Sequence, residues 1–218
     1  MATDQTAIDP TSAPQIVEER EPMLLLDVTG SQNYAAAAGS SVTRKQVMQE
    51  ALGLLVQNLA AQDSQASHEE DGGGLMTVTF ANNTAAKLGD LNPQNFHTLW
   101  NSIRWGGGTY IMPGWRKIQQ VYQEEFGTKP PDERPKLLLL VLTDGEADDT
   151  ASFAQALSQI GGGTFVEIVI TGYGAEHDQA FAAYQRVEQA NQAHVRVTSL
   201  DSETNPETVA RTLLRMIE

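Results

Sequence analysis

The order of apolar and polar positions along the chain predicts a series of short strands. Met23 to Val28 and Leu137 to Leu142 are apolar without alternation, which is typical of strands buried on both faces of a sheet. Leu75 to Ala81 alternates between two sets of side chains, as a strand does. Phe165 to Ile170 predicts a further strand, and the weaker run from Val195 to Leu200 predicts one at an edge.

Helices are predicted between these strands. The first has an apolar stripe at three- and four-residue spacing, formed by Met48, Leu52, Leu55 and Leu59. Thr43 and Gln46, just before it, have the spacing of a capping box. Similar stripes predict further helices over residues 93–103, 115–126, 151–160, 178–187 and 206–218.

Strands that alternate with helices indicate an α/β fold. We expect a doubly wound, mainly parallel six-stranded sheet with one short antiparallel edge strand and helices on both faces. Asn82-Asn83 favours a tight turn, so Thr84 to Leu88 is the expected antiparallel strand. Residues 1–21 carry Thr, Ser, Pro and acids without periodicity, which predicts a flexible acidic tail before one domain over residues 22–218.

Composition narrows the possible functions. The chain has 14 basic and 28 acidic residues, and its formal net charge of -14 disfavours nucleic acid or an anionic membrane as a partner. The absence of cysteine excludes disulfides and zinc–thiolate sites. No signal peptide or membrane-spanning run is visible, so we expect a cytoplasmic protein that is monomeric alone.

Three segments combine acids, hydroxyls and glycines: Asp27-Val28-Thr29-Gly30-Ser31, Gly107-Gly108-Thr109 and Thr143-Asp144-Gly145. The first and third each follow a buried strand. In an open parallel sheet, ligands bind beyond the carboxyl ends of the strands, where the strand order reverses. If the two strands are neighbours there, Asp27 and Asp144 lie close together, and the glycine-backed Thr109 arrives from the side.

Two carboxylates and three hydroxyls in one crevice predict a metal site. Paired carboxylates repel unless one takes up a proton or a cation lies between them. Small oxygen donors suit Mg²⁺ or Mn²⁺, with Ca²⁺ as a possible substitute. Because hydroxyls are uncharged, the ion should attract a further anion, such as a carboxylate from a partner.

In this order, Asp-x-Thr-x-Ser, Gly-Gly-Thr and Thr-Asp-Gly resemble the metal-ion-dependent adhesion site (MIDAS) of von Willebrand factor A (vWA) domains, the integrin I-like family. The likeness spans about Met23 to Glu218. It implies a Rossmann-like fold, with Asp27, Thr29, Ser31, Thr109 and Asp144 as the metal-site residues. It also implies a non-catalytic role in protein–protein interaction, in which an exposed Asp, Glu or C-terminal carboxylate of a partner protein completes the metal's shell.

Thr29 departs from the usual pattern of that family, which has Ser as the first hydroxyl residue. Copine-type vWA domains are similar in having Thr at this position, followed by Gly or Ala and then Ser. The threonine at position 29 therefore favours an intracellular, copine-like relative.

Residues beside the three segments are candidates for contact with a partner. Tyr34 and Tyr110 could be aromatic anchors and Glu146 a polar contact, although loop packing is the alternative for each. The acidic run over residues 146–149 is interpreted as a solvated helix start rather than a second cation site. Trp100 and Trp115 are expected in the core.

Two other functions stay open. Asp27 could be the nucleophile of a Mg²⁺-dependent phosphotransferase or hydrolase, since such enzymes place an aspartate after the first strand. Against this, Thr29 stands where a second acid is needed, and the chain has no GxSxG, HExxH or phosphate-loop motif. The chain could also be a scaffold whose metal site stays unoccupied.

Overall fold

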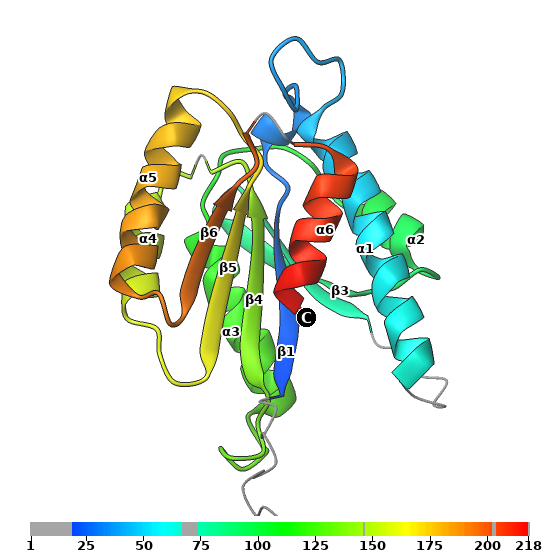
Figure 1. Ribbon diagram of the computed structural model, residues 1–218, viewed down its shortest axis with the longest axis vertical. Coiled ribbons are helices and arrows are strands. Elements are labelled where there is room, and N and C mark those ends of the chain that lie inside the picture. Colours follow the sequence, from blue (N-terminus) through cyan, green and yellow to red (C-terminus); the bar gives the residue numbers. More distant parts are fainter. Residues whose placement is uncertain (1–18, 67–73, 146, 202–203, 218) are drawn as a thin grey trace, which may run out of the picture.

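The computed structural model describes residues 19–66, 74–145, 147–201 and 204–217. Within these ranges one six-stranded sheet has the order β3-β2-β1-β4-β5-β6, and every neighbouring pair is parallel except β2 and β3 (Figure 1). The strands are β1 (Arg20–Asp27), β2 (Leu75–Ala81), β3 (Thr84–Leu91), β4 (Lys136–Thr143), β5 (Thr164–Ile170) and β6 (Val195–Ser199). The predicted mainly parallel sheet with an antiparallel edge strand is confirmed.

Helices cover both faces of this sheet (Figure 1). One layer consists of α1 (Arg44–Ala66), α2 (Phe96–Ser102) and α6 (Pro206–Ile217), and the other of α3 (Met112–Phe126), α4 (Thr150–Ser158) and α5 (Ala175–Ala190). Side chains of β1 alternate between the layers: Leu24 and Leu26 pack with the first, Met23 and Leu25 with the second. Because both faces are buried from Met23 onward, the strand has no polar residue between Met23 and Leu26.

Several predicted boundaries are wrong, including the end of the antiparallel strand β3, which runs to Leu91, and the starts of β1 and the fifth helix. β1 begins at Arg20, because Arg20 and Glu21 continue the parallel pairing with β4, so the last two residues of the predicted tail belong to the sheet. The fifth helix begins at Ala175 after Gly174, whose φ is +94°, so Asp178 lies inside the helix. The rest of the predicted tail, residues 1–18, lies outside the described residues.

β1 and β4 are neighbours at the centre of the sheet, and the strand order runs outward from them in opposite directions. Leu26 pairs with Leu142, so the loops after both strands leave from the same rim. A short 3₁₀ helix, η1 (Gly30–Asn33), follows β1 directly. The fold therefore places the first and third sequence segments side by side at the reversal point.

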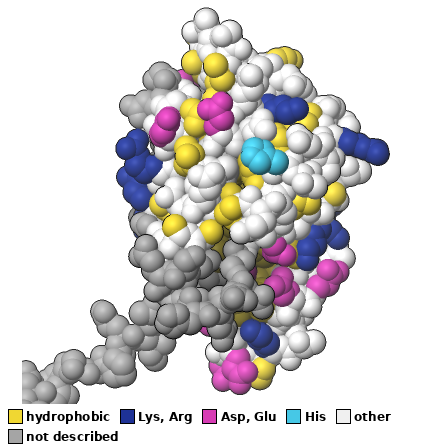
Figure 2. Space-filling model, turned by 90° about the vertical axis from the view of Figure 1, so that its right-hand side faces the viewer, with side chains coloured by type: hydrophobic (Ala, Val, Ile, Leu, Met, Phe, Trp, Pro, Cys, Tyr) yellow, Lys and Arg dark blue, Asp and Glu magenta, His cyan; other side chains and the backbone are white. Residues whose placement is uncertain are grey.

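The surface over α1, α2 and α6 is mixed in character. Hydrophobic side chains on that side lie in small groups among polar and charged ones (Figure 2). None of the described helices is long and apolar enough to cross a bilayer.

Candidate functional site

Asp27 is the last residue of β1, and its side chain is completely buried. Its Oδ1 accepts hydrogen bonds from the Thr29 backbone N–H at 2.9 Å and from the Thr29 hydroxyl at 2.6 Å. Its Oδ2 accepts one from the Thr143 hydroxyl at 2.8 Å, which joins the ends of β1 and β4. The Ser31 hydroxyl lies 3.2 Å from that of Thr29. These side chains form one continuous cluster of oxygen atoms.

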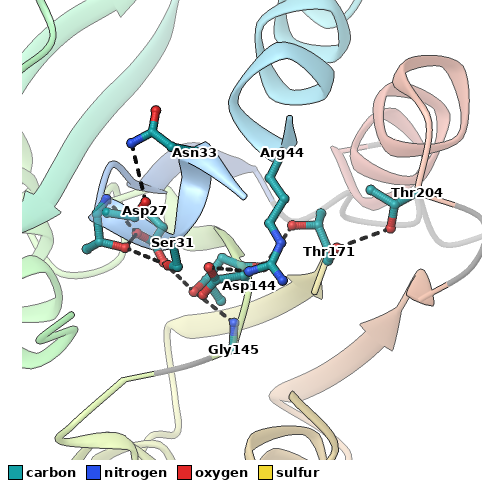
Figure 3. Close-up of polar contacts among 11 residues, drawn as sticks. Asp27, Ser31, Asn33, Arg44, Asp144, Gly145, Thr171 and Thr204 are labelled. Carbon is teal, nitrogen blue, oxygen red and sulfur yellow. Dashed lines mark hydrogen bonds and ion pairs between the residues drawn. The ribbon is translucent and has the colours of Figure 1, made fainter. Parts of the chain in front are cut away.

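Asp144 directly follows β4, and it is also completely buried. Arg44, the first residue of α1, donates a hydrogen bond from Nη1 to Asp144 Oδ2 at 2.7 Å (Figure 3). The exposed fractions of these two side chains are 4% and 0%. The second carboxylate of the site thus has a buried ion-pair partner from a helix 100 residues earlier in the chain.

Asp144 is near enough to influence the protonation of Asp27. Burial and, to a smaller extent, the charge of Asp144 together raise the pKa of Asp27 from 3.8 to about 7, against the opposing effect of the hydrogen bonds from Thr29 and Thr143. At neutral pH, Asp27 therefore has a strong tendency to bind a positive charge, either a proton or a metal ion.

The glycine segment reaches the same rim. The Gly30 N–H donates to the Gly107 carbonyl at 3.0 Å, and the Gly108 N–H donates to Asn82 Oδ1 at 3.0 Å. Gly107 has a φ of +90°, and a Cβ placed on it would lie 1.7 Å from Asn82 Oδ1. A side chain at Gly107 would displace the Asn82 side chain from the β2–β3 turn and would strain the backbone, so glycine is favoured here.

Thr109 is half-buried and lines one hollow together with Gly145, so the second and third segments also meet. The Asp148 N–H donates to the Thr109 carbonyl at 2.8 Å. The Asp149 carboxylate accepts from the N–H groups of Ile111 and Met112, at 2.8 and 3.0 Å. The predicted helix start is confirmed at Thr150, but the carboxylate of Asp149 caps α3 rather than facing only solvent.

The structure describes two of the three predicted partner-contact residues. Tyr34 is 62% exposed and Tyr110 is 36% exposed, so both are accessible beside the site. A hydrogen bond with Asp148 raises the pKa of the Tyr110 hydroxyl. Glu146 lies outside the described residues. Trp100 and Trp115 are buried, as predicted.

Sequence reasoning missed Arg44, Asp149 and Gln32. The Gln32 side chain is fully buried, and its amide nitrogen and oxygen have no hydrogen-bond partner in the described part of the chain. A usable signal existed for Arg44. It stands four residues before Met48, in line with the apolar stripe of α1, and a cation is unfavourable in the first turn of a helix.

Among the described residues, no group of three or more His, Cys, Asp or Glu side chains is arranged to hold a metal ion. A metal bound at this rim would therefore depend on hydroxyl groups as well as the two carboxylates. That donor set is the one that the sequence resemblance implies.

Comparisons with known proteins give the fold class. No protein-family model matches the chain, and no curated protein matches it. Among solved structures, the chain resembles the PilB minor pilin from Streptococcus sanguinis, with a TM-score of 0.64 and 13% identity, over 94% of this chain and 62% of the pilin. This chain thus spans less than two thirds of that pilin's length.

Two further structures agree with this likeness. The manganese-loaded TRAP protein from Plasmodium vivax matches with a TM-score of 0.56 and 15% identity, over 92% of this chain and 74% of TRAP. The conserved hypothetical protein BatB from Bacteroides thetaiotaomicron matches with a TM-score of 0.52 and 13% identity, over 91% of this chain and 98% of BatB. The chain has the Rossmann-like α/β fold of vWA domains, which confirms the predicted fold class.

Proposed function

We propose that this chain is a protein-interaction module that binds Mg²⁺ or Mn²⁺ at the rim between β1 and β4 and presents the ion to a carboxylate of a partner protein. One observation carries the proposal. Asp27 and Asp144, both completely buried, lie with the Thr29 and Ser31 hydroxyls at the carboxyl ends of the two central strands.

The residues at this rim fit a small divalent ion. The hydroxyls of Thr29, Ser31 and Thr109 and the carboxylates of Asp27 and Asp144 would hold it, some of them through water. Both acids are buried, and the pKa of Asp27 is raised to about 7. An added positive charge would therefore stabilise the ionised pair. Such an ion would supply a Lewis-acidic positive charge that attracts a further anion. The manganese-loaded state of TRAP, which has the same fold, supports a divalent ion here.

The partner group is expected to be a single exposed Asp, Glu or C-terminal carboxylate. Arg44 already offsets the charge of Asp144, so the two carboxylates do not fully neutralise a divalent ion, and an anion is the favoured final ligand. The chain's own net charge of -14 disfavours a partner that is strongly acidic overall. Tyr34 and Tyr110 are exposed aromatic side chains of the kind that anchor interfaces, and they would contact the partner beside the ion.

Catalysis by Asp27 is disfavoured by the geometry. Both of its carboxylate oxygens accept hydrogen bonds, and its side chain has no exposed surface, so it is poorly placed to attack a phosphoryl group. A metal-free scaffold is the better-supported alternative, because Arg44 already neutralises Asp144.

Calorimetric titration of the EDTA-treated protein with Mn²⁺ and Mg²⁺ tests the metal site. We expect saturable binding to the natural sequence, loss of binding in Asp27→Ala, and binding weaker by about tenfold or more in Ser31→Ala. Ser41→Ala is the matched control, because Ser41 is an exposed hydroxyl in the same β1–α1 connection. No heat and no thermal stabilisation at millimolar metal would favour the scaffold alternative.

A displayed peptide library tests whether the bound ion recognises a carboxylate of the partner. Peptides selected on the Mn²⁺-loaded protein should share an Asp, a Glu or a free C-terminus, and they should elute with EDTA. Replacing that acid by its amide should abolish binding. Selected peptides that bind equally well in EDTA would contradict metal-dependent recognition.

A further inference from the structure

Arg44 is fixed at the start of α1 by the capping box before it. The Thr43 N–H donates to Gln46 Oε1 at 2.8 Å, and the Gln46 N–H donates to the Thr43 hydroxyl at 3.2 Å. The Arg44 N–H donates to the Tyr34 carbonyl at 3.0 Å. These bonds set where α1 begins, and so they aim the Arg44 side chain at the rim between β1 and β4 (Figure 3).

This position is unfavourable for an arginine on two grounds. A cation in the first turn opposes the helix dipole, and a buried charge is costly unless it is paired. Arg44 is buried, and its Nε has no hydrogen-bond partner in the described residues. Its guanidinium carbon lies 5.5 Å from the centre of the Tyr173 ring and 6.0 Å from that of Tyr34. The short ion pair with Asp144 compensates this cost.

We propose that Arg44 is a built-in counter-cation that competes with the divalent ion for Asp144. The inference rests on the proposed metal site for the identity of the competitor. Arg44 cancels one of the two negative charges of the site, so a divalent ion must either break the Arg44–Asp144 contact or share Asp144 with it. In both cases the site binds the ion more weakly than it would without Arg44.

The same charge balance affects the partner. When a divalent ion is bound while Arg44 is present, positive charge exceeds the charge of Asp27 and Asp144. Only a further anion can neutralise that excess. With Arg44 present, the ion alone therefore binds weakly. The ion and the partner's carboxylate each strengthen the binding of the other.

Lys45 gives a matched control for the removal of Arg44. It is the next residue of the same turn, and its Nζ lies 4.7 Å from the centre of the Trp105 ring. Arg44→Gln and Lys45→Gln remove the same formal charge, but only the first removes the ion pair with Asp144. Arg44→Lys keeps the charge and loses the guanidinium fork.

Mn²⁺ affinity is measured by calorimetry on the EDTA-treated variants, and metal-free stability by urea unfolding. Arg44→Gln is expected to bind Mn²⁺ about tenfold more tightly than the natural sequence and to be less stable without metal. Lys45→Gln and Arg44→Lys should stay within about threefold of the natural affinity. If the natural sequence binds Mn²⁺ and Arg44→Gln binds it no more tightly, the competing role of Arg44 is overturned, while the proposed metal site stands.

Two other results separate this inference from the proposed function. If Arg44→Gln binds Mn²⁺ and the natural sequence does not, Arg44 is the competitor but the natural protein is a metal-free scaffold. If neither binds, both proposals fail. Should Arg44→Gln not fold, the nitrogen-15 signal of Arg44 Nε in the natural sequence, assigned by its loss in Arg44→Lys, is followed during Mg²⁺ addition. A shift that is absent in Asp27→Ala supports competition, and an unchanged signal refutes it.

Discussion

Without metal, raising the pH should destabilise this protein through Asp27. In the folded state the pKa of Asp27 is about 7, above its ordinary value of 3.8, because of burial and the charge of Asp144. The folded protein therefore holds this proton more tightly than the unfolded chain does. The resulting stabilisation is complete below the ordinary pKa and is lost as the pH rises through the folded pKa of about 7.

The size of the effect follows from the pKa of Asp27. Each pH unit between the folded and unfolded pKa values is worth about 1.4 kcal/mol. The rise from 3.8 to about 7 therefore corresponds to at most about 4.5 kcal/mol of unfolding free energy. Glu21 contributes in the same direction, because partial burial and the charge of Glu125 raise its pKa to about 7 as well.

Urea unfolding in EDTA between pH 5 and pH 8 isolates the contribution of Asp27 when the natural sequence is compared with Asp27→Asn. The amide keeps the shape of the side chain but cannot ionise. Asp27→Asn should flatten the decline in stability with pH and should be more stable than the natural sequence at pH 8. Glu21→Gln is the control for the other carboxyl group with a raised pKa. Adding it to both proteins should leave the stability difference between the natural sequence and Asp27→Asn unchanged.

Saturating Mn²⁺ should reverse the order at pH 8, because a bound ion stabilises the ionised carboxylate and Asp27→Asn has lost it. Parallel stability curves for the natural sequence and Asp27→Asn in EDTA would refute the reasoning. That result would mean that the Thr29 and Thr143 hydrogen bonds offset the cost of burying the charge.

Two further predictions concern the loop that carries Thr109. Gly107→Ala should lower the unfolding free energy by about 1–3 kcal/mol, because the new Cβ meets Asn82 and the φ of +90° is strained. Gly108→Ala is the control: its Cβ would have only one ordinary contact, so the unfolding free energy should change by less than about 0.5 kcal/mol in the same urea assay. Asp149→Ala should cost about 1–2 kcal/mol by removing the cap of α3. It should also weaken Mn²⁺ binding in calorimetry, and unchanged affinity would show that the cap does not position Thr109.

The central part of the fold could be predicted because burial on both faces leaves a simple signature. Met23 to Leu26 and Leu137 to Leu142 have no polar positions, and the structure pairs the two strands at the centre of the sheet. The same reasoning failed at the ends of elements. Arg20 and Glu21 pair with β4 although their composition is that of a tail, because backbone hydrogen bonds do not depend on side-chain polarity.

The candidate site was predictable where it depends on topology. Asp27 and Asp144 each follow a central strand, so the switch-point rule places them together. The contact between Asp149 and α3 could not be predicted in this way. It joins residues 37 and 38 positions apart through backbone N–H groups, which have no sequence signature of their own.

Arg44 falls between these two cases. Its contact with Asp144 spans 100 residues, and no motif links them. However, two acids predicted to lie together in a buried site require a compensating cation, and the chain has only 14 lysine and arginine residues in total. Among those near the start of α1, Arg44 shares the apolar stripe with Met48 and Leu52, whereas Lys45 does not. Charge balance together with helical periodicity therefore selects Arg44 as the counter-charge of the two buried acids.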